Sequence, residues 1–323
     1  MNTLPSDHRV LAPDATGISK AAKELASGQL VTFPTETVYG LGADATNDQA
    51  VASIFEAKGR PRFNPLIIHV PDIKTAKRFV EFNANAEKLA EAFWPGALTM
   101  VLPRQEGSTL SHLVSAGLDS VAIRVPSHPI ANALLNEAGC PVAAPSANRS
   151  GHVSPTLAEH VQHSWPHSGS IGPSIILDGG ACRVGLESTV VEVTESACTL
   201  LRPGGITSSE LEQVIGNLSI ADGSPDAPKS PGMMARHYAP ATPVILNATT
   251  QEVSGAYLGF GPDTPDATLN LSVSGDLKEA AANLFAMLRQ LDNGNFSSIA
   301  ISPVPETGLG QAINDRLRRA ATS

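Results

Sequence analysis

Hydrophobic and polar positions between residues 18 and 215 follow two different periods. Apolar residues recur every three or four positions in three segments, which predicts helices over residues 18–28, 47–59 and 85–96. Short continuous apolar runs predict buried strands at residues 29–35, 65–70, 98–103, 121–126, 140–147, 174–180, 188–193 and 198–205, the last run being the final strand. This mixture predicts an α/β domain whose sheet is mixed rather than purely parallel.

The pattern changes after Gly216. Residues 216–241 are rich in Pro, Gly, Ser and Asp and have almost no apolar period, which predicts a linker. Beyond it, strand-like runs, a long helix over residues 276–294 and a closing helix over residues 308–322 predict a second, smaller α/β domain. The predicted division is therefore residues 1–215, 216–241 and 242–323.

The length of 323 residues suits two domains, and a composition of 42% hydrophobic and 16% charged residues is typical of a globular protein. No apolar run is long enough for a membrane helix, and the N-terminus lacks a signal-peptide pattern, so we expect a cytoplasmic protein. The three cysteines have no C-x-x-C spacing, which argues against a disulfide framework and a zinc ribbon.

The formal net charge of −9 argues against a protein that lives on a nucleic-acid backbone, so we expect little direct binding of nucleic acid, RNA included. Local basic clusters then matter more than the total charge. They lie at residues 58–62, 77–78 and 316–319. The third is predicted to end a surface helix, where cations complement the helix dipole.

The common nucleotide and hydrolase motifs are missing from the sequence. It contains no G-x-x-x-x-G-K-[ST] loop, no G-x-G followed by the third glycine, no G-x-S-x-G and no H-E-x-x-H. A bound nucleotide would therefore need side chains to hold its phosphates.

His160, His163 and His167 lie at spacings that put them on one helical face, which is typical of a metal site. Pro166 would break that helix before His167, and no acidic or cysteine partner is close in sequence. A solvated helix end is the favoured interpretation, and no metal site is predicted.

Residues 58–70 gather three cations in front of an apolar strand. Lys58 could complement a helix dipole, and Arg60 and Arg62 could be solvated loop charges. The alternative is a loop held by two prolines, in which two guanidinium groups and an ammonium bind a polyphosphate. His69 lies inside the strand, where a histidine is most often part of a core.

Two further segments carry polar groups at strand ends. Thr35 and Thr37 either bond their own turn or form the lip of a pocket for a small polar ligand. Arg124 lies in the middle of an apolar strand and must pair, because a buried guanidinium without a partner costs several kcal/mol. Its partner is either an internal carboxylate or the carboxylate of a ligand.

Taken together, seven segments in order resemble the YrdC/Sua5 family, the threonylcarbamoyl-AMP synthases. They are residues 34–42, 58–70, 94–102, 121–129, 144–156, 185–193 and 200–205. Residues 230–240 and the domain after them are similar to the longer, two-domain Sua5 form. The resemblance implies a YrdC-like twisted mixed sheet with helices, plus a small Rossmann-like α/β C-terminal domain.

The resemblance also implies a reaction and a site. L-threonine, bicarbonate and ATP, the last with Mg2+, would give threonylcarbamoyl-AMP and pyrophosphate for the N6-threonylcarbamoyl modification of tRNA. The residues that match the family's threonine side are Thr35, Thr37, His69, Arg124, Ala144 and Ser188. Those that match its ATP side are Lys58, Arg60, Asn64, Ser120, Ser146, Asn148, Ser154, Arg202, Arg236, His237 and Tyr238.

The linker departs from the family pattern at Met234 and Ala235, where a basic and an aromatic residue are common. We still expect it to cover the pocket as a lid, with Arg236 and His237 at the phosphates. The product would pass to the tRNA threonylcarbamoyltransferase machinery.

Two other functions were weighed against the synthase. A non-catalytic RNA-binding module fits poorly with the acidic charge and the absence of interleaved aromatic residues. The related carbamoyltransferase of hydrogenase maturation adds an acylphosphatase-like domain and cysteine-rich zinc motifs, and this chain has neither.

Overall fold

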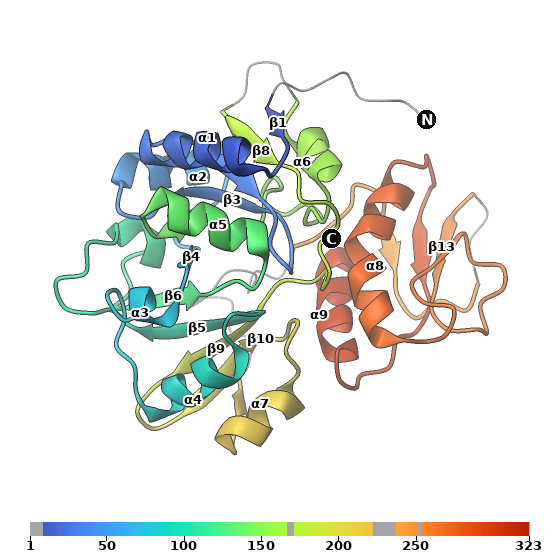
Figure 1. Ribbon diagram of the computed structural model, residues 1–323. Helices are drawn as coiled ribbons and strands as arrows, with labels where there is room; N and C mark the ends of the chain where they lie inside the picture. Colours follow the sequence, from blue (N-terminus) through green and yellow to red (C-terminus); the bar gives the residue numbers. More distant parts are fainter. Residues whose placement is uncertain (1–8, 167–170, 222–236, 251–253, 323) are drawn as a thin grey trace.

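The computed structural model describes residues 9–166, 171–221, 237–250 and 254–322, which form a large and a small sheet (Figure 1). The strands of the large sheet are β1 (Val10–Leu11), β2 (Val31–Phe33), β3 (Gly40–Asp44), β4 (Ile67–His69), β5 (Leu98–Pro103), β6 (Ser120–Arg124), β7 (Val142–Ala143), β8 (Ile175–Leu177), β9 (Thr189–Val193), β10 (Cys198–Arg202) and β11 (Ser219–Ile220). Their spatial order is β1-β8-β2-β3-β7-β4-β6-β5-β9-β10-β11.

Helices accompany this sheet along the chain. They are α1 (Ala15–Ala26), α2 (Asp48–Lys58), α3 (Ile73–Ala76), α4 (Ala84–Phe93), α5 (Pro129–Ala138), α6 (Ala158–Ser164) and α7 (Ser208–Ile215), with a 3-10 turn at His112–Ser115. Parallel pairs such as β4–β6 occur beside antiparallel pairs such as β5–β6, so the predicted mixed sheet is confirmed.

Helix α2 leads the chain directly to the cationic segment. Asn47 caps its start by accepting hydrogen bonds from the backbone N–H groups of Gln49 and Ala50, and Gly59 ends it in the left-handed conformation at φ 61°. These are the ends that the sequence predicts. Lys58 is the last residue of α2, so the helix fixes the position of Lys58 and of the loop that begins after it.

Successive side chains of β4 point in turn to the core and to the opposite face of the sheet. Ile68 belongs to the main core cluster together with residues of α2 and α4. Its neighbours Ile67 and His69 therefore point to the opposite face, where both line a cleft. In the parallel pairing of β4 with β6, His69 lies beside Arg124.

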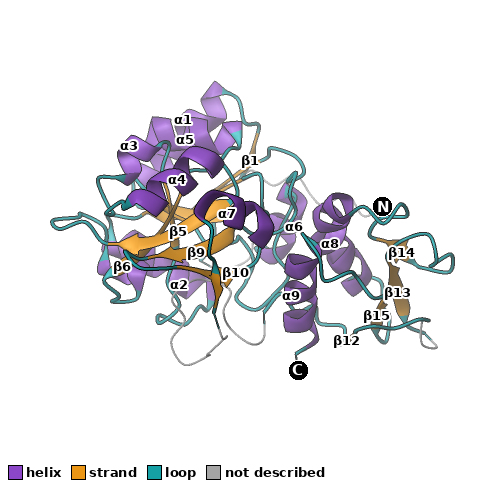
Figure 2. Cartoon of the chain, turned by 90° about the horizontal axis from the view of Figure 1, so that it is seen from below, coloured by secondary structure: helices purple, strands orange, loops and turns teal. Residues whose placement is uncertain are grey.

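The small sheet has the order β12-β15-β13-β14, and all of its pairs are parallel. Its strands are β12 (Val244–Ile245), β13 (Ala256–Gly259), β14 (Leu269–Asn270) and β15 (Ile299–Ile301), and its helices are α8 (Leu277–Asp292) and α9 (Gly310–Ala321). Figures 1 and 2 show that both helices lie between the small sheet and the large one. No helix among the described residues is both long enough and apolar enough to span a membrane.

The structure corrects three expectations. The strand at residues 198–202 is not the last of the large sheet, because β11 pairs with it in parallel from inside the predicted linker. The sequence predicts no strand at residues 40–44, but β3 is a largely buried strand there. A side chain at Gly42 would lie 2.8 Å from both Phe33 and Val142, so glycine there permits close packing of neighbouring strands.

The third correction concerns the basic cluster at residues 316–319. Arg318 is exposed, as expected for a helix end at the surface, but Arg316 is completely buried. The reason is that this face of α9 is turned toward the large sheet rather than toward solvent. The guanidinium pairs there with Glu187, and it also pairs with Asp315 of α9 itself.

Candidate active site

A cleft of about 500 Å3, its open mouth included, lies on the face of the large sheet that Ile67 and His69 share. The cleft brings together all six residues matched to the threonine side, namely Thr35, Thr37, His69, Arg124, Ala144 and Ser188. From the ATP side it brings in Arg60, Ser146, Arg202, His237 and Tyr238.

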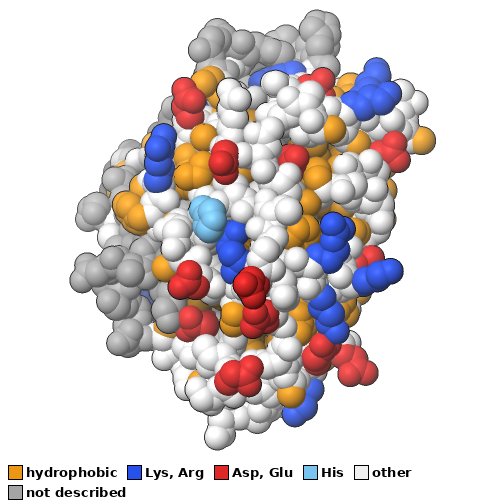
Figure 3. All heavy atoms as spheres, turned by 90° about the vertical axis from the view of Figure 1, so that its left-hand side faces the viewer, with side chains coloured by type: hydrophobic (Ala, Val, Ile, Leu, Met, Phe, Trp, Pro, Cys, Tyr) orange, Lys and Arg blue, Asp and Glu red, His pale blue; other side chains and the backbone are white. Residues whose placement is uncertain are grey.

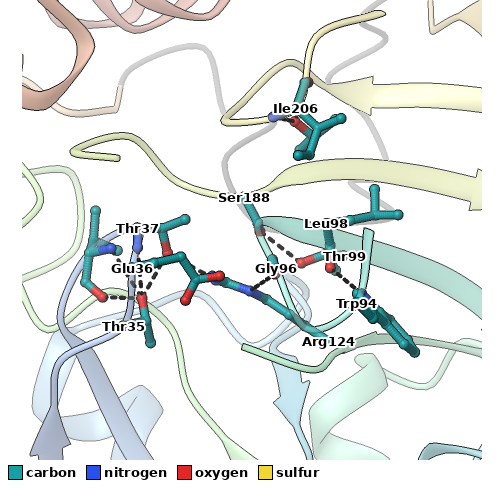
Figure 4. Close-up of polar contacts among 12 residues, drawn as sticks. Thr35, Glu36, Thr37, Trp94, Gly96, Leu98, Thr99, Arg124, Ser188 and Ile206 are labelled. Atoms are coloured by element: carbon teal, nitrogen blue, oxygen red, sulfur yellow. Dashed lines mark hydrogen bonds and ion pairs between the residues drawn. The ribbon is translucent and has the colours of Figure 1, made fainter. Parts of the chain in front are cut away.

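Arg124 is buried and has an internal partner (Figure 4). Its Nη2 donates to Glu36 Oε1 at 2.6 Å, its Nη1 to Thr37 Oγ1 at 2.9 Å and its Nε to the carbonyl of Gly96 at 3.1 Å. Of the two partners that the sequence left open, the internal carboxylate is therefore present. A guanidinium has five N–H groups, so these bonds leave further donors at the cleft.

Glu36 is the residue that the sequence analysis missed at this end. It is buried, and its second carboxylate oxygen, Oε2, has no hydrogen-bond partner. Burial acts to raise its pKa, but Arg124 beside it outweighs this and the pKa is lowered. The carboxylate is thus ionised and holds Arg124 in place.

His69 is a neutral imidazole. Burial lowers its pKa to about 3, and the charge of Arg124 acts in the same direction. Its Nδ1 is buried without a hydrogen-bond partner, and the ring meets Phe33 edge-on. The packing is that of a core histidine, but the ring also lines the cleft with an unsatisfied polar atom, so a role in ligand binding stays a prediction.

Hydroxyl groups line the space around Arg124. Thr35 Oγ1 donates to the carbonyl of Val38 at 2.7 Å, which is the turn-forming bond expected of a threonine in such a loop. Ser188 Oγ lies 2.7 Å from Thr99 Oγ1, and Arg202 donates to the Ser188 carbonyl at 2.8 Å (Figure 4 shows Thr99 and Ser188). The positions of these hydroxyls are consequently fixed before any ligand binds.

The cationic segment is buried rather than solvated. Lys58 donates to the carbonyls of Ser146 and Asn148, and Arg60 donates to Asn64 Oδ1 at 2.6 Å and to the Pro65 carbonyl at 2.8 Å. Burial lowers the pKa of Arg60 to about 9 and that of Lys58 well below its usual range. The solvated-loop interpretation is therefore wrong for Arg60.

Arg62, in contrast, is exposed and fits the solvated-loop interpretation. The other residues matched to ATP lie behind the cleft lining or away from it. Asn64 accepts from Arg60, and the Asn148 side chain donates to two nearby carbonyls. Ser120 begins β6 four residues from Arg124, roughly 13 Å along the strand at ~3.3 Å per residue, and the structure does not bring it to the cleft.

His237 and Tyr238 reach the cleft from the end of the predicted linker. Both are buried, and the His237 ring centroid lies 3.9 Å from that of Tyr238. Burial lowers the pKa of His237 well below its usual range, and Arg60, Lys58 and Arg202 add to this. The predictions made for Met234, Ala235 and Arg236, and the prediction that the linker forms a lid, concern residues outside the described part of the chain.

Glu187 is a second cleft residue that the sequence analysis missed. Its Oε1 accepts from Ser154 Oγ at 2.5 Å and its Oε2 from Arg316 Nε at 2.9 Å. Both oxygens are engaged, and no group of three His, Cys, Asp or Glu in the described part of the chain could hold a metal.

Two family models cover nearly all of the chain. The model Sua5_yciO_yrdC, described as telomere recombination, matches residues 23–204. The model Sua5_C, described as the C-terminal domain of threonylcarbamoyl-AMP synthase, matches residues 206–322. The chain belongs to the two-domain Sua5 family.

Similar proteins agree with this assignment. The threonylcarbamoyl-AMP synthase of Bacillus subtilis is 42% identical, over 94% of this chain and 92% of that protein. The one of Pyrococcus abyssi is 43% identical, over 93% of each. The crystal structure of P. abyssi Sua5 complexed with L-threonine superimposes with a TM-score of 0.88 over 97% of each chain at 40% identity.

The structure of Escherichia coli YciO shares the fold of the first domain alone, with a TM-score of 0.51 over 60% of this chain at 21% identity. The predicted fold class, a YrdC-like mixed sheet with a small Rossmann-like C-terminal domain, is therefore confirmed. Glu187 could have been singled out from the sequence, because it lies beside Ser188 in a segment that resembles the family.

Proposed function

We propose that this protein is an L-threonylcarbamoyladenylate synthase, which converts L-threonine, bicarbonate and ATP into threonylcarbamoyl-AMP and pyrophosphate. The observation that carries the proposal is one cleft lined by two sets of buried cations. Arg124, which has N–H groups to spare, forms the first end of the proposed site, and Arg60 and Arg202 form the second, with Ser188 between Arg202 and the first end. An amino acid and a triphosphate need this combination of partners.

At the first end, Arg124 would bind the threonine carboxylate with the N–H groups that Glu36, Thr37 and Gly96 do not engage. His69 is neutral and offers a lone pair on Nδ1, so it would accept a hydrogen bond from the amino acid. Ser188 and Thr35 complete the lip. The fixed hydroxyls would hold the amino group at the entrance to the nucleotide end.

The reaction needs no protein nucleophile. Bicarbonate first takes up a proton and loses one oxygen as water, which gives CO2. The threonine amine then forms a bond to the carbon of CO2 and releases a proton, which gives a carbamate. A carbamate oxygen then attacks the α-phosphorus of ATP while the bond to the β-phosphate oxygen breaks and pyrophosphate leaves. This is a nucleotidyl transfer, in which the protein aligns the reactants and stabilises negative charge.

At the second end, Arg60, Arg202 and neutral His237 would contact the phosphates, with Lys58 and Asn64 holding the loop behind them. Mg2+ bound to ATP supplies further charge neutralisation. The labile product would be consumed by a tRNA threonylcarbamoyltransferase in the cytoplasm. On the face that Figure 3 draws, Lys and Arg side chains alternate with Asp and Glu, an arrangement that does not favour RNA binding.

The test is an assay of pyrophosphate release from ATP. We expect release only when L-threonine and bicarbonate are both present, and weak release when serine replaces threonine. Labelled bicarbonate should appear in the adenylate product by mass spectrometry. If pyrophosphate release did not depend on threonine while RNA bound tightly and in a salt-sensitive way, the RNA-binding module would replace the synthase.

A further inference from the structure

One ion pair joins the small domain to the wall of the cleft. Arg316 lies on α9 and is completely buried, and its Nε donates to Glu187 Oε2 at 2.9 Å. The other oxygen of the same carboxylate accepts from the hydroxyl of Ser154 at 2.5 Å. A helix of the small domain thus reaches a residue on the nucleotide side through a single carboxylate.

The same helix holds the end of the linker. The guanidinium of Arg316 lies 5.1 Å from the ring centroid of Tyr238, within the range of a cation–π contact. One turn further along α9, the carbonyl of Arg319 accepts from the backbone N–H of His237 at 3.4 Å. Both described linker residues at the cleft therefore rest on α9.

Apolar contacts repeat this arrangement. The core cluster of the small domain includes four buried residues that precede residue 242 in the chain, each next in sequence to a residue of the cleft or to Ser154: Val38, Val153, Leu186 and Tyr238. The segments that carry the site polar groups are thus anchored in the core of the other domain.

Helix α8 also packs closely against the segment that contains Gly185, and no side chain would fit at that glycine. A Cβ at Gly185, where φ is +73°, would lie 2.4 Å from the Cα of Ala282 and 2.5 Å from the carbonyl oxygen of Ala281. Gly185 precedes Glu187 by two residues. The position of Glu187 is consequently set by the small domain from two sides.

We propose that Arg316 is a positioning residue for the nucleotide, because it neutralises Glu187 and holds it against Ser154. This inference rests on the proposed function. Glu187 lines a cleft meant for a polyanion, and a buried carboxylate without its cation would repel the phosphates. With Arg316 in place, the cations Arg60 and Arg202 act on the nucleotide without that opposing charge.

The contacts predict an effect on one substrate. Arg316 touches Glu187 and Tyr238, whereas Arg124 and His69 lie on central strands and are held by Glu36, Gly96 and the sheet itself. Loss of Arg316 should therefore weaken ATP and leave L-threonine nearly unchanged. A merely structural role would weaken both.

The experiment measures binding of a non-hydrolysable ATP analogue and of L-threonine to the full chain by calorimetry. We expect Arg316→Gln to weaken the analogue by about tenfold or more, as for a lost charge-assisted contact, and to change threonine affinity by less than about twofold. The double variant Arg316→Gln with Glu187→Gln should recover most of the analogue affinity, because the amide keeps an acceptor for Ser154 and removes the charge.

Arg318→Gln is the matched control. It removes an exposed ion pair with Glu306, 2.7 Å long, from the same helix, and both affinities should stay within about twofold. If Arg316→Gln does not fold, Arg316→Lys keeps the charge, loses the planar fork and should give a smaller loss for the analogue alone.

Unchanged analogue affinity in a folded Arg316 variant, equal losses for both ligands, or no recovery in the double variant would each overturn the positioning role. Threonine-dependent pyrophosphate release by the unaltered protein is measured in parallel. Its absence would count against the synthase, whereas normal release with any of the three results above would count against Arg316 alone.

Discussion

The residues proposed to bind threonine (the amino-acid end) and those proposed to bind the phosphates (the phosphate end) rest on different supports. At the amino-acid end, His69 and Arg124 are register partners on the neighbouring strands β4 and β6, in the interior of the large sheet. At the phosphate end, Arg60 lies in a loop and His237 at the end of the linker. Each end has one buried Arg–Glu pair, but the first pair lies within one domain and the second spans two.

The side chains at the first end are held in place by the sheet, whereas those at the second end are held in place by contact between the two domains. A side chain on a central strand is fixed by hydrogen bonds and packing on both sides. A side chain on a loop is fixed only while its partner elements stay in contact. Changes at the first end should therefore affect threonine and global stability, and changes at the second should affect ATP.

The largest effect is expected for Arg124→Met. It removes the partner of the threonine carboxylate and leaves Glu36 buried and uncompensated, so we expect pyrophosphate release to fall more than ~100-fold and the free energy of unfolding to drop by about 3–5 kcal/mol. Steady-state assays and urea unfolding measure the two quantities.

The double variant Arg124→Met with Glu36→Gln separates these two effects. It should regain much of the lost stability, because the buried charge is gone, while threonine use stays poor. Full recovery of activity in the double variant would contradict a direct role of Arg124 at the carboxylate.

Local sequence chemistry was enough to predict the elements that support the site. The caps of α2 and the strand that carries His69 follow from Asn47, Gly59 and an apolar run, because each depends on neighbours a few residues apart. The need of Arg124 for a partner followed from its apolar strand. β3 and β11 were missed because one is glycine-rich and the other is a two-residue, exposed edge strand.

The identities of the ion-pair partners could not be predicted in the same way. Glu36 and Arg124 are separated by 88 positions, and Glu187 and Arg316 by 129. A carboxylate beside two threonines carries no local sign of burial, and Arg316 has the spacing of a helix-end cation at the surface. Only the packing of α9 against the large sheet distinguishes it from Arg318.

Arg60→Ala is expected to have the next largest effect. It removes a cation proposed to bind the phosphates, together with its hydrogen bonds to Asn64 and the Pro65 carbonyl, so we expect the KM for ATP to rise roughly 10- to 100-fold and the KM for threonine to change little. Initial rates at varied ATP measure this. Arg62→Ala is the control, since its exposed side chain two residues away should leave both constants within about twofold.

His69→Ala should act in the opposite sense and less strongly. A hydrogen bond from a neutral imidazole contributes about 0.5–1.5 kcal/mol, so we expect the KM for threonine to rise roughly two- to tenfold while the KM for ATP is kept. Exposed His112 gives a control variant. If Arg60→Ala and His69→Ala raised the same KM and no other, the two ends would not be separate binding regions.

The smallest effect concerns acid stability and tests the supports directly. The pKa of His69 is lowered in the folded protein. Below pH ~6.5 the unfolded chain therefore binds a proton at His69 that the folded chain does not bind, and the protein loses stability as the pH falls toward about 3. There is no contribution above pH ~6.5. His69→Asn should reduce the fall in unfolding free energy by up to ~1.4 kcal/mol per pH unit.

The pKa of His237 is also lowered, and the sign is the same. However, a linker end that detaches from α9 can take up a proton without global unfolding, whereas a histidine on β4 cannot. His237→Asn should therefore reduce the pH dependence of the free energy of unfolding less than His69→Asn does. Urea unfolding between pH 6.5 and 5 measures this dependence. Equal reductions would mean that the linker end is held as firmly as the sheet, and that the two ends differ in their chemistry but not in their rigidity.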